Sequence, residues 1–128
     1  MGSEDEGELR ARRRAQRVVR TGTRRLPNGQ YIPTPLIHLT NRDFRKAFDR
    51  LRPGIKEQTK RRHRLLERKP GAKKLDLWSP FDAIWRAEVG YGYRAVGEMY
   101  AVPVITWLWV GPHEGYDDIL DDLRANLT

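Results

Sequence analysis

Two segments in the first half of the chain carry apolar residues at the spacing of a helix. Between residues 41 and 51 the apolar positions recur at i, i+3, i+4 and i+7, and Thr40 is placed to cap the helix that they predict. We expect a second helix to start at Pro53, because proline favours the first helical turn, and to run to about Arg68. The connection between the two is so short that they should form an antiparallel hairpin.

From Phe81 onward the apolar period changes to two, which predicts strands. One face of the first strand carries Ala83, Trp85, Ala87 and Val89, and the other carries Ile84, Arg86 and Glu88. After a hairpin turn at Gly90-Tyr91-Gly92, the apolar face continues with Tyr93, Ala95, Gly97 and Met99, and the polar face with Arg94, Val96 and Glu98. This register places Arg94 opposite Glu88 and diagonal to Arg86, so we expect a charged patch on the sheet face away from the helix hairpin.

The remaining apolar segments complete a small α+β domain over residues 36–128. Residues 102–110 are apolar on both faces, which is typical of a central strand covered from both sides, and Trp107 and Trp109 should share one face. After residues 111–115 a short C-terminal helix keeps helical spacing, with Tyr116, Ile119, Leu120 and Leu123. The expected fold is a helix hairpin, preceding the strands, packed on a small antiparallel sheet that ends in this helix.

Residues 1–35 do not fit this pattern. They are rich in arginine and contain three prolines but few apolar residues, so we expect a basic, flexible arm that cannot bury a core. The sequence of the arm predicts a short helix over residues 9–20 and a turn at Asn28-Gly29. Such an arm either binds nucleic acid nonspecifically or is an extension without a function.

Charge divides the 128-residue chain into two unlike parts. Residues 1–74 have a net charge of +14, and residues 75–128 have a net charge of −6. Clustered Lys and Arg attract polyanions, so nucleic acid or a ribosome is the expected partner of the first part, although solvated helix faces would give similar runs of charge.

Several function classes are excluded or disfavoured by the residues that the chain lacks. It has no cysteine, which excludes disulfides, thiolate metal sites and cysteine nucleophiles and is typical of a reducing cytoplasm. The three histidines, His38, His63 and His113, show no metal-ligand spacing, and nucleotide-binding glycine motifs and a serine-hydrolase motif are absent. The longest apolar run, residues 101–110, is short for a membrane span, and the start of the chain is acidic where a signal peptide would be basic.

The order of these elements resembles the RelE/ParE superfamily of toxins, and in particular its RelE and HigB-like branch. The residues that carry the resemblance are Tyr93-Arg94-Ala95-Val96-Gly97 on a strand and residues 109–117, WVGPHEGYD, at the end of the sheet. It covers about residues 36–125, and the N-terminal arm departs from it. The resemblance implies a toxin of a type II toxin–antitoxin system, neutralised by a cognate protein antitoxin. It also implies one of two activities, which are cleavage of mRNA in the ribosomal A site or inhibition of DNA gyrase.

Metal-independent RNA cleavage needs a group that binds the scissile phosphate and groups that move protons. Arg94 matches the strand arginine of the family and would bind the phosphate, unless it only pairs with Glu88 or Glu98. His113 is the first candidate for general acid or base, against a histidine that only caps the last helix. Tyr116 would either stack on a base or assist proton transfer, unless it belongs to the core. Arg86 would supply a second cation to the site, unless it only balances the charge of Glu88.

The general base stays open among Glu88, Glu98, His113 and Tyr116. The basic helix should dock on ribosomal RNA through charge and shape, and the residues expected to bind RNA are Lys56, Lys60, Arg61, Arg62, His63, Arg64, Lys73 and Lys74. Trp107 and Trp109 are expected in the core rather than as a stacking platform.

Our interpretation is therefore a cytoplasmic, ribosome-dependent mRNA endonuclease. Its partners would be an antitoxin, the ribosome and mRNA, without a metal, a small-molecule cofactor or a membrane. The alternatives are a ParE-like gyrase inhibitor without nuclease activity and a nucleic-acid-binding module without catalysis.

Overall fold

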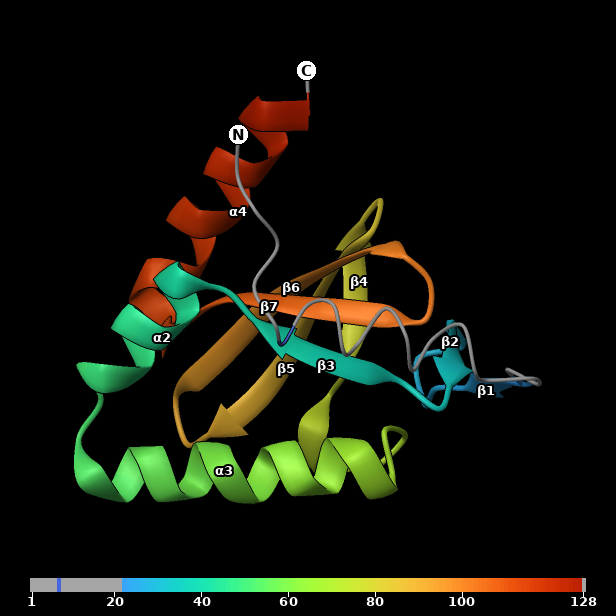
Figure 1. Cartoon of the computed structure of the whole chain (residues 1–128), viewed down its shortest axis with the longest axis horizontal. Helices are drawn as coiled ribbons and strands as arrows, with labels where there is room; N and C mark the ends of the chain where they lie inside the picture. The colour runs from blue at the N-terminus through green and yellow to red at the C-terminus, as the bar shows by residue number, and fades with distance from the viewer. Residues whose placement is uncertain (1–6, 8–21, 128) are drawn as a thin grey trace.

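The chain forms a five-stranded sheet with helices on both faces and a separate two-stranded ribbon (Figure 1). This computed structural model describes residue 7 and residues 22–127. The elements in chain order are β1 (Gly22–Arg25), β2 (Tyr31–Thr34), β3 (Ile37–Thr40), α2 (Arg42–Asp49), α3 (Pro53–Arg68), the short 3-10 helix η1 (Lys73–Leu75), β4 (Trp78–Phe81), β5 (Ile84–Gly90), β6 (Tyr93–Ala101), β7 (Val104–Pro112) and α4 (His113–Leu127). Within the described residues, no helix has the length and apolar character needed to cross a bilayer.

The sheet has the strand order β3-β7-β6-β5-β4. The antiparallel pairing of β5 with β6 and of β6 with β7 is confirmed, and β7 is an interior strand as its apolar character on both faces predicted. The expectation of an antiparallel sheet is wrong at one edge, because β3 pairs with β7 in parallel. β3 has only four residues, and so short a segment shows no period from which its partner could be inferred.

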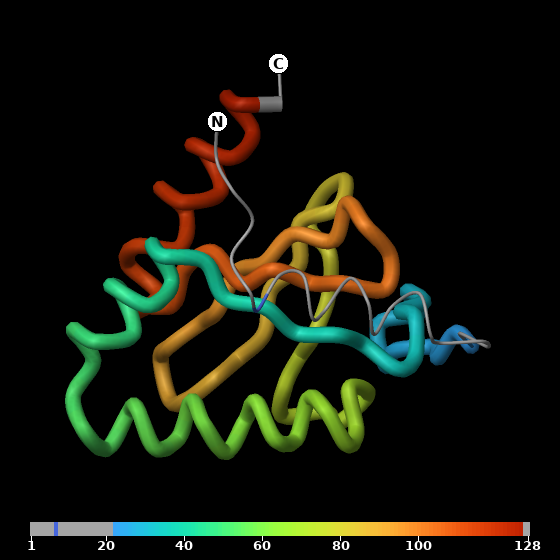
Figure 2. Tube along the Cα trace, in the orientation of Figure 1, coloured from blue at the N-terminus to red at the C-terminus, as the bar shows by residue number. Residues whose placement is uncertain are grey.

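The two central helices form where the sequence predicted them, but they do not form an N-terminal hairpin. Among the described residues three strands precede them, and each helix packs on a different strand, α2 on β7 and α3 on β5. Figure 2 shows the two helices running in different directions. The helix cap is also one residue later than expected, because the side chain of Asn41 accepts a hydrogen bond of 2.8 Å from the Phe44 N–H, while Thr40 ends β3.

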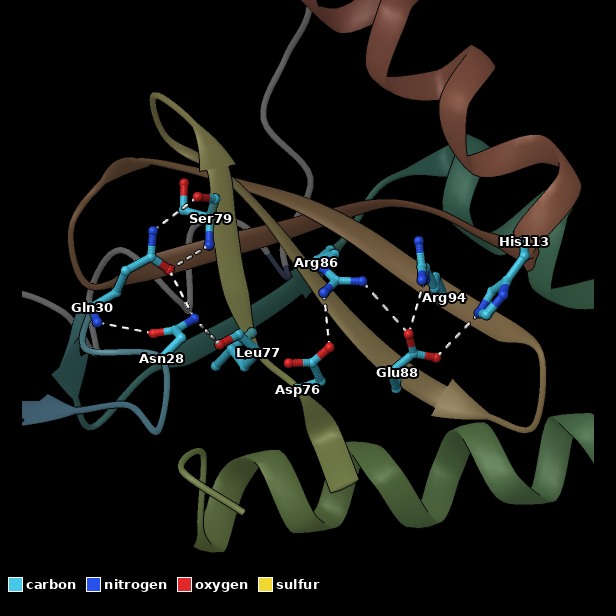
Figure 3. Close-up of polar contacts among 9 residues, drawn as sticks. All are labelled: Asn28, Gln30, Asp76, Leu77, Ser79, Arg86, Glu88, Arg94 and His113. Carbon is cyan, nitrogen blue, oxygen red and sulfur yellow. Dashed lines mark hydrogen bonds and ion pairs between the residues drawn. The ribbon is translucent and has the colours of Figure 1, made fainter. Parts of the chain in front are cut away.

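Part of the expected arm belongs to the folded body. Leu26 and Ile32, which are 2% and 0% exposed, lie in the main core, so the expectation that residues 1–35 cannot bury a core is wrong for the ribbon of β1 and β2. Amide side chains fasten this ribbon to β4 (Figure 3): Gln30 Nε2 donates to the Ser79 carbonyl at 2.9 Å, and the Ser79 N–H donates to Gln30 Oε1 at 2.8 Å. The helix expected over residues 9–20 lies outside the described residues.

The sheet buries apolar side chains on both faces. The larger cluster lies between the sheet and helices α2 and α3, and it includes Trp85, Ala87, Val89, Ala95, Met99, Ile105, Trp107 and Val110. The smaller cluster lies under α4 and joins Ile84 and Val96 to Tyr116 and Leu120. The face that was expected to be polar is therefore covered over part of its length, and only the remaining part is available for a polar site.

An irregular pairing of β6 with β7 sends the two tryptophans to opposite faces. Val96 pairs with Trp109 and Gly97 pairs with Trp107, so Leu108 is an extra residue in β7. Trp107 then lies in the larger cluster and Trp109 packs against the smaller one. The expectation that both indoles share a face is wrong, because strict alternation cannot foresee an inserted residue.

Two glycines make room for the indole of Trp109 where β7 meets α4. A Cβ atom on Gly111 would collide with Trp109 Cζ2, and a Cβ atom on Gly115 would lie 3.0 Å from the same atom. The spacing of these glycines therefore lets the start of α4 fold over the ring. The helix begins at His113, so the packing of Gly111 and Gly115 against Trp109 determines the position of that histidine.

Replacing Ile32 with alanine should lower the free energy of unfolding by about 2–5 kcal/mol, because it leaves a cavity in the main core. Tyr31→Ala, on the neighbouring residue of the same strand, is the control. Its side chain is largely exposed, and we expect a change of about 0.5 kcal/mol or less. Urea denaturation measures both. Equal stability of the Ile32→Ala variant and the wild type would contradict the assignment of the ribbon to the core.

Replacing Gly111 with alanine should destabilise the protein by about 1–3 kcal/mol, because the added methyl group overpacks the Trp109 ring. Gly54→Ala is the matched control, since a Cβ atom there meets nothing within 4 Å in the first turn of α3. Thermal denaturation followed by tryptophan fluorescence checks both variants. The account of the β7–α4 junction fails if the two behave alike.

Candidate functional site

The carboxylate of Glu88 lies at the centre of a charged cluster on the sheet face that α4 leaves uncovered (Figure 3). Arg94 Nε donates to Glu88 Oε1 at 2.9 Å, and Arg86 Nη1 lies 3.6 Å from the same oxygen. His113 Nε2 lies 3.4 Å from Glu88 Oε2. We call Arg86, Glu88, Arg94 and His113 the Glu88 cluster. Three of the four residues that the sequence predicted to be catalytic thus contact one carboxylate.

Strand register brings these side chains together. Arg86 and Glu88 are two residues apart on β5 and so share a face, and Arg94 on β6 is the register partner of Glu88. His113 joins them because its backbone N–H donates to the Gly92 carbonyl at 3.0 Å, which ties the first residue of α4 to the β5–β6 turn. The predicted pairing of Arg94 with Glu88 is confirmed.

Arg86 is held more firmly than Arg94 and is less accessible. Its Nη2 donates to Asp76 Oδ2 at 2.8 Å, its Cζ lies 5.3 Å from the centroid of the Trp78 ring, and its side chain is 14% exposed. The contacts favour the alternative in which Arg86 balances Glu88. Neither Asp76 nor Trp78 was among the predicted site residues. One signal in the sequence could have placed this segment against the core. Leu75 and Leu77, which are both buried there, alternate with the polar residues Lys74 and Asp76.

Tyr116 lies in the core beneath Arg94. It is 6% exposed and packs with Ile84, Val96 and Leu120, while Arg94 Cζ lies 4.6 Å from the centroid of its ring. Burial raises the pKa of its hydroxyl, although the charges of Arg86 and Arg94 oppose the rise. Of the two alternatives for Tyr116, the structure has the position in the core. The ring also holds the guanidinium of Arg94 through a cation–π contact.

Glu98 is separated from the cluster along β6. Its register partners are Ile84 and Thr106, which places it four residues from Arg94 on the same strand. At strand spacing this corresponds to roughly 13 Å. Burial raises the pKa of its carboxyl group. Because of its distance from Arg94 and His113, Glu98 no longer fits the role of a general base for this cluster.

The outer face of α3 carries a basic groove of about 590 Å³, lined by Gln58, Arg61, Arg62, Arg64, Leu65, Glu67, Arg68 and Lys74. It brings together four of the residues expected to bind RNA, which are Arg61, Arg62, Arg64 and Lys74, and adds Arg68 and Gln58. Arg62 Nη1 donates to the Lys74 carbonyl at 2.7 Å, which joins η1 to the helix. The groove is therefore a cationic surface supported on regular structure.

The other residues expected to bind RNA lie elsewhere. Lys56 Nζ is 5.9 Å from the centroid of the Phe48 ring, and Lys60 Nζ is 3.6 Å from Glu57 Oε1. Lys73 lies in η1 and is not among the residues that line the groove. These three side chains do not line the basic groove.

His63 is turned away from the basic groove and toward a second cavity of about 710 Å³ between α2, α3 and the sheet. Its ring lies 5.0 Å from that of His38, and its Nε2 lies 3.2 Å from Glu67 Oε1. His38 Nδ1 accepts a hydrogen bond of 3.1 Å from the indole of Trp107. Burial, together with the charge of His63, lowers the pKa of His38 to about 4. Grouping His63 with the groove arginines is therefore wrong.

The two tryptophans differ in their environment. Trp107 is buried in the larger cluster, and Trp109 is partly buried against the smaller one. The expected core positions are confirmed. Among the residues that the structure describes, no group of three or more His, Asp or Glu could hold a metal ion.

Comparison with known proteins identifies the fold. No protein-family model and no curated protein matches the sequence. Solved structures do match. The RelB–RelE antitoxin–toxin complex from Methanococcus jannaschii has a TM-score of 0.51 at 19% identity, over 63% of this chain and 96% of that one. The archaeal RelE–RelB complex from Pyrococcus horikoshii OT3 has a TM-score of 0.48 at 20% identity, over 60% and 93%. The isolated E. coli RelE toxin has a TM-score of 0.48 at 16% identity, over 69% and 98%. The likeness to the Methanococcus jannaschii protein shows that this chain has the fold of RelE.

Proposed function

We propose that this chain is the toxin of a type II toxin–antitoxin pair and that it cuts mRNA on the ribosome. The observation that carries the proposal is the Glu88 cluster, in which an arginine, Arg94, and a histidine, His113, contact the same carboxylate. The fold supports it, because the solved structures that match are RelE toxins, two of them in complex with RelB. A protein antitoxin is accordingly the proposed partner.

Arg94 is the proposed phosphate ligand. Its bond to Glu88 uses Nε, and the guanidinium carries two further amino groups that can donate to phosphate oxygens in a charge-assisted fork. Contacts with Glu88 and with the Tyr116 ring hold the group in place before substrate arrives. A pre-positioned cation stabilises the extra negative charge that the phosphate gains in the transition state.

His113 is the proposed proton-transfer group. In RNA cleavage without a metal, the 2′-oxygen attacks the adjacent phosphorus, the bond to the 5′-oxygen breaks, and the proton lost by the 2′-hydroxyl must be balanced by one gained at the 5′-oxygen. The side chain of His113 is 45% exposed, so its ring can reach a bound strand while Glu88 orients it. Glu88 and His113 remain as candidates for the base, because Glu98 lies too far away and Tyr116 is buried with a raised pKa.

The basic groove is the proposed ribosome contact. Its arginines and Lys74 would bind phosphates of ribosomal RNA and contribute affinity without reading bases. A cytoplasmic location is part of this proposal, because ribosomes are the proposed site of action. The contact of His113 with Glu88 has no role in a ParE-like gyrase inhibitor. It also has no role in a nucleic-acid-binding module without catalysis.

Replacing His113 with alanine should reduce cleavage of a translated reporter message by about 10²- to 10⁴-fold, the usual contribution of general acid–base catalysis. Primer extension after induced expression measures the cuts, and thermal denaturation checks that the variant is folded. His63→Ala is the matched control, since its side chain is 49% exposed, close to the 45% of His113, but contacts Glu67 instead.

We expect wild-type cleavage for the His63→Ala variant. Undiminished cleavage by a folded His113→Ala variant would contradict the role given to this histidine. If the wild type stops DNA synthesis and leaves the message whole, gyrase inhibition replaces the proposal.

A further inference from the structure

The β5–β6 turn presents the most exposed large apolar side chain among those of the described residues. Tyr91 is 95% exposed, compared with 65% for Val102, 62% for Tyr31 and 58% for Tyr100. A single exposed aromatic residue needs no special explanation by itself. The contacts made on either side of this residue are what distinguish it.

The glycine before Tyr91 is in contact with the helix of the basic groove. A Cβ atom on Gly90 would lie 2.7 Å from Gln58 Oε1 and 3.6 Å from Gln58 Cβ, so α3 packs directly on the turn. Gln58 also lines the basic groove. Figure 2 shows the turn lying beside α3. Gln58 therefore links the groove to this turn.

The glycine after Tyr91 is in contact with the Glu88 cluster. The Gly92 carbonyl accepts the backbone N–H of His113 at 3.0 Å, and Gly92 has a φ of +77°, a conformation that glycine adopts without strain. Tyr91 thus stands between Gln58 of the groove and His113 of the cluster. A strand that runs from the groove to Arg94 around this turn passes Tyr91.

We propose that Tyr91 is a substrate-binding residue on which a base next to the scissile phosphate stacks. The ligand is single-stranded RNA, because only an unpaired base offers a free face to the phenol ring. Stacking would turn the base out and hold the adjacent phosphate against Arg94. The inference rests on the proposed function and deepens it, since it adds a contact to the base to the contacts with phosphate.

The test compares Tyr91→Ala, Tyr91→Phe and Tyr100→Ala by primer extension on the translated reporter. Tyr91→Ala should lower the rate of cutting by on the order of tenfold, as expected for the loss of one stacked base. Tyr91→Phe should stay within about twofold of the wild type, because the stacking face is kept. Tyr100→Ala is the matched control, an exposed tyrosine near the opposite end of β6, and should cut like the wild type.

The distribution of cut sites separates stacking from a structural role. Modest base preferences come from stacking strength, so Tyr91→Ala should weaken the preference at the position next to the cut, which a folding defect would leave unchanged. Wild-type rate and cut sites in Tyr91→Ala would overturn the inference, as would a Tyr91→Phe variant as slow as Tyr91→Ala. Either result leaves the proposed function standing if His113→Ala is inactive. A wild type that does not cut the message overturns both.

Discussion

The extra residue in β7 is the constraint on which both layers of the protein depend. Opposite Val96 and Gly97 the strand offers Trp107, Leu108 and Trp109, and the inserted residue reverses the direction of every side chain that follows. Upstream of it, Trp107 faces α2 and α3; downstream, Trp109 faces α4. A regular strand would turn both indoles into the larger cluster and leave the base of α4 without its largest apolar contact.

The same extra residue in β7 also determines where the polar site lies. Because Trp109 fills the space beside Gly111 and Gly115, α4 begins directly at the end of the sheet, and His113 reaches Glu88 from there. Val96 and Ile84 are covered by α4, whereas Glu88 and Arg94 lie beyond it on the same face. One sheet face thus serves as core along part of its length and as a charged surface along the rest. Gln58 of the basic groove contacts Gly90 in the β5–β6 turn, and the same turn contacts His113 of the site.

Sequence reasoning was most successful where a long segment kept one period. The strands β5 and β6, the pairing of Arg94 with Glu88 and the helix from Pro53 to Arg68 all follow from alternation or helical spacing. It failed where the structure depends on a single inserted residue or on a partner that is distant in the sequence. Leu108 breaks the alternation without any local signal, and Leu26 and Ile32 are isolated apolar residues whose burial depends on β4. His63 sits among arginines in the sequence but lies on a different side of the helix from the groove, next to His38.

The central claim is that the chain cuts messages only while they are being translated. Two versions of one reporter message test it, one with its start codon and one without, with protein and DNA synthesis followed by pulse-labelling in the same cells after induction. The account predicts that protein synthesis falls first and that primer extension finds cuts only in the version with a start codon. Equal cutting of both versions, or an early loss of DNA synthesis with intact message, would contradict it.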